Sequence, residues 1–243
     1  MIDYLTVVYK NYDLLDLQLD NFKNKFSEVD YRLIVVDNTP DNEKKPIERK
    51  KEINLIVELE SYPTFDGISH GNAINTGLQY CESKTICLFD TDFFFLKDGK
   101  KIHNYIDEKF SLGYKAVGTE LNDGDGTNPV VNRFIDNFRD IPCCFGSFYN
   151  LELAQSCSWV ISPEELNVNI NTGFIEVGWR IRKKILEDKI KTMYWKTDST
   201  KYGDCFFRNE NEEVMGFHYV GGSHRRWSAN SYEEIKNIIN MEY

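Results

Sequence analysis

The first 95 residues alternate between short apolar runs and segments of helical character, and this alternation most constrains the fold. Apolar, largely β-branched or aromatic runs occupy 2–9, 31–36, 53–59 and 85–89. Segments of helical character lie between these runs. Residues 14–26 have helical spacing of apolar residues, 69–81 are a further helical candidate, and 41–52 are charged and suit a solvated helix. Strands in which apolar residues do not alternate with polar ones are typical of parallel sheets that are covered by helices on both faces. We therefore expect an α/β fold with a mostly parallel central sheet flanked by helices.

Three side chains with binding chemistry stand at the carboxyl ends of expected strands. They are Tyr9, Asp37 and Asp90. Right-handed crossovers bring the loops after parallel strands to one edge of the sheet, where ligands of open α/β sheets bind. This edge is therefore the expected binding site.

The second half of the chain is less regular. A strand is expected over 114–118 and helices over 176–187 and 231–239, the last N-capped by Ser231 with Glu234 three residues later. Because no linker separates two regions of different composition, we expect one domain over residues 1–243.

Composition and charge exclude several classes of function. The 29 basic and 39 acidic residues give a formal net charge of −10, so the chain does not attract nucleic acid or anionic lipid. No apolar run approaches the roughly 18 residues of a membrane span. Asp3 interrupts any signal peptide. The six cysteines form no CxxC pair, which predicts free thiols rather than a zinc site. A soluble, cytoplasmic protein is expected.

The strongest candidate for chemistry is the acidic pair Asp90 and Asp92. The pair follows the apolar run TICLF and precedes FFFL, so a rigid element would hold its carboxylates. Carboxylate oxygens are ligands for Mg²⁺ or Mn²⁺, and such an ion neutralises a bound diphosphate. Asp123 and Asp125 have the same spacing but lie in NDGDGTN, a turn composition. The alternative for the first pair is a helix-capping or loop-ordering role.

A second candidate is the segment GFHYVGGSHRRW, which begins with Gly216. His218 would complete a facial metal site with two carboxylates, and Gly221 and Ser223 offer exposed backbone N–H groups. Arg225 and Arg226 suit phosphate oxygens. The alternative is a core histidine beside a solvated arginine pair.

A third candidate is the helix start HGNAINTG, residues 70–77. His70, Asn72 and Asn75 lie among small residues, where a nucleotide could approach the backbone. A close contact between the helix and the sheet would explain the small residues equally well.

Together these segments resemble the nucleotide-sugar-dependent glycosyltransferases of GT-A type, with a first half similar to family 2. The resemblance rests on VVDNT, GNAINTG, FDTD and the HYVGGSHRRW segment, in that order. It implies that Asp37 contacts the base and that Asp90, Thr91 and Asp92 bind metal, diphosphate and ribose. It also implies a GT-A-like, Rossmann-like fold with a nucleotide-binding half over 1–100. Residues 101–243 would form the acceptor-binding half and the C-terminal metal and phosphate loop.

The resemblance further implies an acceptor site between the acidic pair and His218. Gly146 and Ser147 lie in the segment that resembles the one beside the donor sugar. Glu176 is the candidate catalytic base of an inverting transfer, with a role at the helix dipole as its alternative. Trp179 would stack on an acceptor sugar or pack in the core.

The expected function is metal-dependent transfer of a sugar from a UDP- or GDP-sugar to a glycan or another hydroxyl acceptor. Tyr9, His70, Asn72 and Asn75 are further expected donor contacts, and Mn²⁺ or Mg²⁺ is the expected cofactor. One alternative is a nucleotidyltransferase of similar fold, although VVYKNYDLL lacks the glycine-rich loop such enzymes carry after the first strand. Another is a non-catalytic module that binds a glycan or a protein.

Overall fold

The computed structural model describes residues 1–59, 66–120, 141–160, 177–199, 205–219 and 232–241. The strands are β1 (Ile2–Val8), β2 (Tyr31–Asp37), β3 (Leu55–Glu58), β4 (Thr85–Asp90), β5 (Phe93–Phe95), β6 (Ala116–Thr119), β7 (Gly146–Asn150), β8 (Thr192–Ser199), β9 (Cys205–Arg208) and β10 (Val214–His218). The helices are α1 (Tyr12–Lys25), the 3-10 turn η1 (Lys50–Glu52), α2 (Asp66–Leu78), α3 (Gly99–Ser111), α5 (Leu151–Gln155), α7 (Trp179–Glu187) and α8 (Tyr232–Asn240).

The described strands form one ten-stranded sheet in the order β3-β2-β1-β4-β7-β6-β8-β9-β10-β5. The neighbours from β3 to β4 are all parallel, as are β6 and β8. The strands β7, β9 and β5 run against the others through antiparallel pairs. The expected α/β fold with a mostly parallel sheet is confirmed, and the antiparallel strands belong to the second half and to β5.

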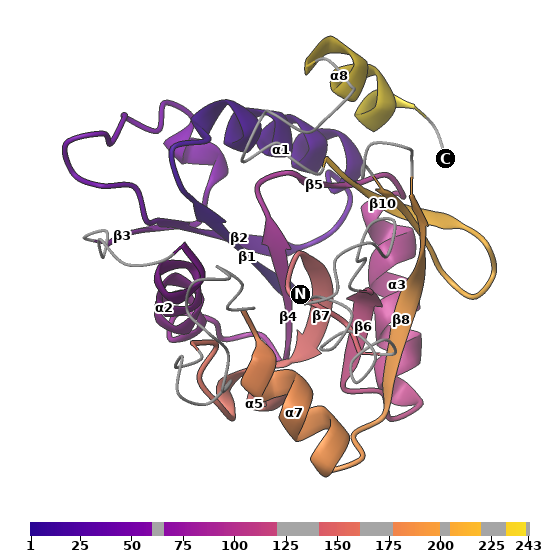
Figure 1. Ribbon diagram of the computed structural model, residues 1–243. Helices are drawn as coiled ribbons and strands as arrows, with labels where there is room; N and C mark the ends of the chain where they lie inside the picture. Colours follow the sequence, from indigo (N-terminus) through magenta and orange to yellow (C-terminus); the bar gives the residue numbers. More distant parts are fainter. Residues whose placement is uncertain (60–65, 121–140, 161–176, 200–204, 220–231, 242–243) are drawn as a thin grey trace.

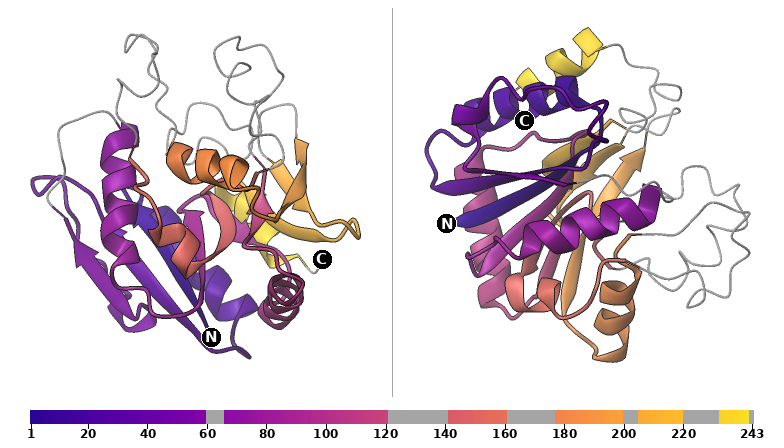
Figure 2. Two further views of the ribbon diagram at one scale, coloured as in Figure 1. Left: turned by 90° about the horizontal axis from the view of Figure 1, so that it is seen from below. Right: turned by 90° about the vertical axis from the view of Figure 1, so that its left-hand side faces the viewer.

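Helices cover both faces of the sheet (Figures 1 and 2). One core contains apolar side chains of α1 and α3 and includes Tyr4 of β1, whereas the other contains those of α2, α5 and α7 and includes Leu5. Consecutive strand residues therefore point into different cores, which is why the sequence shows uninterrupted apolar runs. The helix α8 packs on α1 in a third cluster with β5 and β10.

The expected helix over 41–52 is wrong apart from its last turn, η1. Pro46 lacks a backbone N–H and disfavours helical geometry in the residue before it. The charged side chains instead make ion pairs, including Lys10 with Glu43 at 2.8 Å and Arg49 with Asp20 at 2.7 Å. The charge pattern alone therefore predicted solvent exposure correctly but not helix.

Other sequence expectations agree with the structure within a few residues. The helix expected over 69–81 is α2, which begins at Asp66. The run FFFL, expected only as an apolar stretch, contains a separate strand, β5, that pairs with β10. All six cysteines are free thiols, as predicted, and five of them are buried. Among the described residues, no helix has the length and apolar character needed to span a membrane.

Candidate functional site

The candidate site lies at β1, where the order in which strands are added to the sheet changes direction. The chain passes from β1 outward to β2 and β3, and then returns to the other side of β1 with β4. The carboxyl ends of β1 and β4 therefore lie at a topological switch point, the position at which open α/β sheets bind ligands. Asp90, the last residue of β4, pairs in register with Val7 of β1. This topology brings the acidic pair to the predicted edge.

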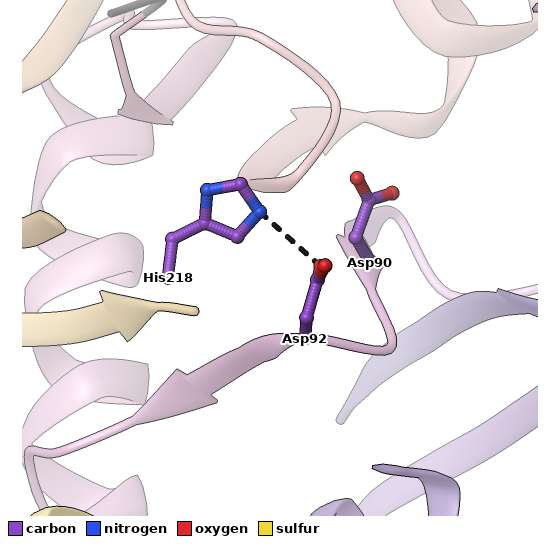
Figure 3. Close-up of side chains that lie close together, drawn as sticks. All are labelled: Asp90, Asp92 and His218. Carbon is purple, nitrogen blue, oxygen red and sulfur yellow. Dashed lines mark hydrogen bonds and ion pairs between the residues drawn. The ribbon is translucent and has the colours of Figure 1, made fainter. Parts of the chain in front are cut away.

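Asp90, Asp92 and His218 converge at this edge, as Figure 3 shows. One ligand atom from each of the three side chains lies within 4.8 Å of the other two. The Nε2 atom of His218 is 3.2 Å from Oδ1 of Asp92. The sequence places these residues more than 120 positions apart, and pairing of β10 with β5 sets His218 opposite Phe93. The expected grouping of the acidic pair with His218 is therefore present in the structure.

The donor set and its spacing suit a small divalent cation. Two carboxylates and one imidazole are ligands that Mn²⁺ accepts, and carboxylate oxygens are the usual protein ligands of Mg²⁺. Adjacent ligands of an octahedral ion with bonds of about 2.1 Å stand about 3 Å apart. The separation of 3.2 Å between Asp92 and His218 is close to this value. The three side chains could thus bind one ion.

The surroundings of Asp90 destabilise its ionised carboxylate, and a bound cation would reduce this destabilisation. Burial raises its pKa above the usual range, the neighbouring Asp92 adds to the rise, and His70 and His218 oppose it. His70 approaches from α2, with Nε2 3.6 Å from Oδ1 of Asp90. The site therefore concentrates two acids and two imidazoles at one strand end.

Two residues that the sequence interpretation missed support this cluster. The ring of Phe145 stacks on the imidazole of His218, with centroids 4.7 Å apart and planes 9° from parallel. Gln18 of α1 donates hydrogen bonds to the backbone carbonyls of Asp90 and Phe93. The only sequence signal for Gln18 was a polar residue on an otherwise apolar helix face. Phe145 lies in the segment expected beside the donor sugar, but nothing in the sequence indicated its contact with His218.

The residues after β1 and β2 form a second part of the same edge. Asp37 is buried, and its two carboxylate oxygens accept hydrogen bonds from the hydroxyl of Tyr12 at 2.9 Å and the backbone N–H of Thr39 at 3.0 Å. Tyr9 is 40% exposed, with Nζ of Lys10 above its ring. Asp37 thus orders its own loop, and Tyr9 presents an aromatic surface at the strand end.

The small residues of α2 make the close contacts that the sequence analysis gave as an alternative. A Cβ atom at Gly77 would lie 2.5 Å from Leu5 of the sheet, and one at Gly71 would lie 2.9 Å from the carbonyl oxygen of Trp159. The side chain of Asn75 bonds to Ser158 and to the backbone N–H of Trp159. On this helix, His70 is the residue that faces the acidic pair, and Asn72 is half-buried.

The described residues of the expected acceptor site have packing roles. Gly146 lies against the ring of Phe93, and Ser147 is fully buried with its hydroxyl 3.2 Å from that of Thr119. Trp179 packs, partly buried, on the core beneath α7. Thr91 of the acidic turn is also buried. The predicted residues that lie outside the described part of the chain are Glu176, Gly221, Ser223, Arg225 and Arg226.

Comparisons with known proteins find similarity of structure only. No model of a known protein family matches the chain, and no curated protein sequence does. Among solved structures, S. aureus TarS is similar over 68% of this chain at 18% identity, with a TM-score of 0.47. The mannosyltransferase PcManGT from Pyrobaculum calidifontis, in complex with GDP-Man and Mn²⁺, is similar over 64% at 17% identity, with a TM-score of 0.47.

A third similar structure is glucosyl-3-phosphoglycerate synthase from Mycobacterium tuberculosis, in complex with Mn²⁺ and UDP-glucose. It is similar over 63% of this chain at 17% identity, with a TM-score of 0.45. The chain spans 31%, 46% and 57% of the lengths of these three proteins, in the order given. At such identities and TM-scores, the similarities carry no argument about what this chain binds or catalyses.

Proposed function

We propose that this chain is a metal-dependent glycosyltransferase that moves a sugar from a nucleoside-diphosphate sugar to a hydroxyl acceptor. The observation that carries the proposal is the cluster of Asp90, Asp92 and His218 at the carboxyl end of β4, beside β1, where the direction of the sheet connections changes. A dication-binding group at such a switch point suits a ligand that carries a diphosphate.

In this proposal, Asp90, Asp92 and His218 hold Mn²⁺ or Mg²⁺. When bound, the ion supplies charge that stabilises the diphosphate leaving group. Gly221, Ser223, Arg225 and Arg226 follow His218 in the chain, and we assign them to the diphosphate oxygens because backbone N–H groups and guanidiniums bind phosphate.

We assign the donor's nucleoside to the half formed by residues 1–100. The exposed ring of Tyr9 at the end of β1 offers a stacking surface for a base. Asp37 is proposed to order the base-binding loop through Thr39 and to contact the base of UDP or GDP. His70 is proposed to lie beside the diphosphate because it already faces Asp90. Thr91, Asn72 and Asn75 complete this proposed donor site.

We assign the acceptor to the half formed by residues 101–243. Glu176 is the proposed base that takes the proton of the acceptor hydroxyl in an inverting transfer. Trp179 is proposed to contact an acceptor glycan, and Gly146 and Ser147 to shape the wall behind the donor sugar by packing on Phe93 and Thr119. The six free thiols agree with the cytoplasm as the proposed compartment.

The experiment is donor hydrolysis with Mn²⁺, measured for the wild type and for Asp92→Asn. The amide loses the charged ligand but keeps the shape, so we expect turnover to fall by about 100-fold or more. Asp188→Asn is the matched control, since Asp188 is an exposed carboxylate that pairs with Lys184 on α7. Full turnover by Asp92→Asn would refute the metal assignment. In a separate assay with a nucleoside triphosphate and a sugar phosphate, release of inorganic pyrophosphate would identify a nucleotidyltransferase. Absence of any turnover in both assays would favour a binding module.

A further inference from the structure

Two amide side chains of α1 bind the segment that carries the acidic pair. Gln18 and Asn21 are both 2% exposed, and their spacing places them on one face of the helix. Asn21 donates to the carbonyl of Phe95 at 2.8 Å and accepts from the Phe95 N–H at 3.0 Å. Gln18 donates through Nε2 to the carbonyls of Asp90 and of Phe93, the latter at 3.2 Å. The helix therefore holds this segment through backbone atoms.

These contacts have a simple cause in the topology of the sheet. Among the described strands, β5 ends the sheet and pairs with β10 alone, so the backbone groups on its other side require partners. The described edge of β5 lies beside α1 rather than beside another strand (Figure 1). An amide side chain can both donate and accept, and Asn21 bonds to Phe95 as a neighbouring strand would.

Gln18 differs from Asn21 in the atoms that it joins. Both hydrogen bonds described for the Asn21 side chain go to Phe95 of β5, whereas Gln18 bridges the carbonyl at the end of β4 and the carbonyl at the start of β5. Between these two carbonyls lies the turn of Thr91 and Asp92. We propose that Gln18 is a positioning residue that fixes the separation of the Asp90 and Asp92 carboxylates for the cation.

The way Gln18 is buried supports this role. Its side-chain oxygen Oε1 has no hydrogen-bond partner among the described residues, and burying an unpartnered carbonyl costs free energy. Leu14, Leu15 and Leu19 of the same helix are buried in the cores, so an apolar residue at position 18 would avoid this cost. An apolar residue would therefore pack at position 18 at lower cost, and what Gln18 provides in addition is the Nε2 donor to the two carbonyls.

The inference rests on the proposed metal site, because it assigns Gln18 a role toward the ion that Asp90 and Asp92 would hold. Two other backbone contacts described for the turn each hold one end of it. The Asp90 N–H donates to the carbonyl of Phe145, and the Asp92 carbonyl accepts from the N–H of Tyr219. Without Gln18, the two ligand-bearing ends would be held separately, and their separation would be less well defined.

The experiment is a titration of the ion-free protein with Mn²⁺ alone, with free Mn²⁺ measured by electron paramagnetic resonance. Gln18→Met keeps the approximate volume and removes the donor, and we expect Mn²⁺ affinity to fall by about 10-fold or more. Asn21→Leu is the matched control on the same helix face. We expect it to lower the melting temperature and to leave Mn²⁺ affinity within about twofold of wild type.

Each outcome of this titration supports or overturns the positioning role of Gln18. Wild-type affinity in folded Gln18→Met would overturn the inference, as would an equal loss in Asn21→Leu, because general loosening would then explain both. If Gln18→Met does not fold, Gln18→Asn replaces it, since the shorter amide cannot reach both carbonyls and should weaken Mn²⁺ binding similarly. A wild-type protein that binds no Mn²⁺ would overturn both the metal site assigned to Asp90, Asp92 and His218 and this inference. Failure of the inference alone is recognised by wild-type protein that binds Mn²⁺ while Gln18→Met binds it equally well.

Discussion

Replacing Gly216 with alanine should displace the ring that supports the acidic turn. The ring of Phe93 packs closely against both Gly216 and Gly146, where added Cβ atoms would lie 2.3 Å and 2.5 Å from ring carbons. To reach an ordinary contact of 3.4 Å from Gly216, the ring must move by about 1.1 Å, and its close contact with Gly146 limits how it can move. Overpacking of this kind costs about 1–3 kcal/mol.

This cost corresponds to a fall in melting temperature of about 2–12 °C for a chain of this size. The assay is thermal unfolding of Gly216→Ala, Phe93→Leu and the double variant. Leucine lacks the ring carbons that clash, so the double variant should lose less stability than the sum of the single variants, with a coupling of about 0.5–3 kcal/mol. Wild-type stability of Gly216→Ala, or strict additivity, would refute the packing argument.

Two further predictions concern polar groups outside the site. The half-buried His103 has its Nε2 atom 3.0 Å from the hydroxyl of Tyr4. Burial lowers the pKa of His103 and the N-terminus adds to this fall, whereas Asp107 and Asp30 oppose it. The unfolded chain therefore binds the proton more readily, and stability to urea should fall as pH drops through 6.5, the usual value for histidine. His103→Gln should flatten this pH dependence, and an unchanged slope would contradict the assignment. Asp3 is fully buried and accepts from the N–H groups of Glu82 and Ser83 and from the Ser83 hydroxyl, so Asp3→Ala should cost about 3 kcal/mol in urea unfolding and Ser83→Ala about 1 kcal/mol. Equal costs would show that the two backbone bonds contribute nothing.

The parallel half of the fold was predictable because each of its strands is buried on both faces. Such strands have uninterrupted apolar sequences, as in 31–36 and 85–89. Because parallel strands end at the same edge of a sheet, the sequence alone was enough to place Tyr9, Asp37 and Asp90 together there. The acidic pair was distinguished from Asp123 and Asp125 by the same local context. These predictions depend on residues that are close together in the sequence.

The less predictable features depend on contacts between distant segments. The grouping of His218 with the acidic pair was expected, but the strand pairing of β5 with β10 that produces it was not, because nothing in FFFL or VMGFH indicates that partner. The bridge from Gln18 to the acidic turn spans more than 70 positions, and the stacking of Phe145 on His218 spans a similar distance. The helix expected over the charged stretch 41–52 is wrong because Pro46 disfavours helical geometry there.

The measurement that tests the central claim most directly is a thermal-shift screen with UDP, GDP and CMP and their common sugars, each with and without Mn²⁺. A ligand at about 100 times its dissociation constant adds about 2.7 kcal/mol to the free energy of unfolding. We expect a shift for UDP or GDP and its sugars that requires Mn²⁺ and is absent in Asp92→Asn. A nucleotide shift of equal size without Mn²⁺, or one retained by Asp92→Asn, would contradict the assignment of Asp90, Asp92 and His218 to a metal that binds the donor.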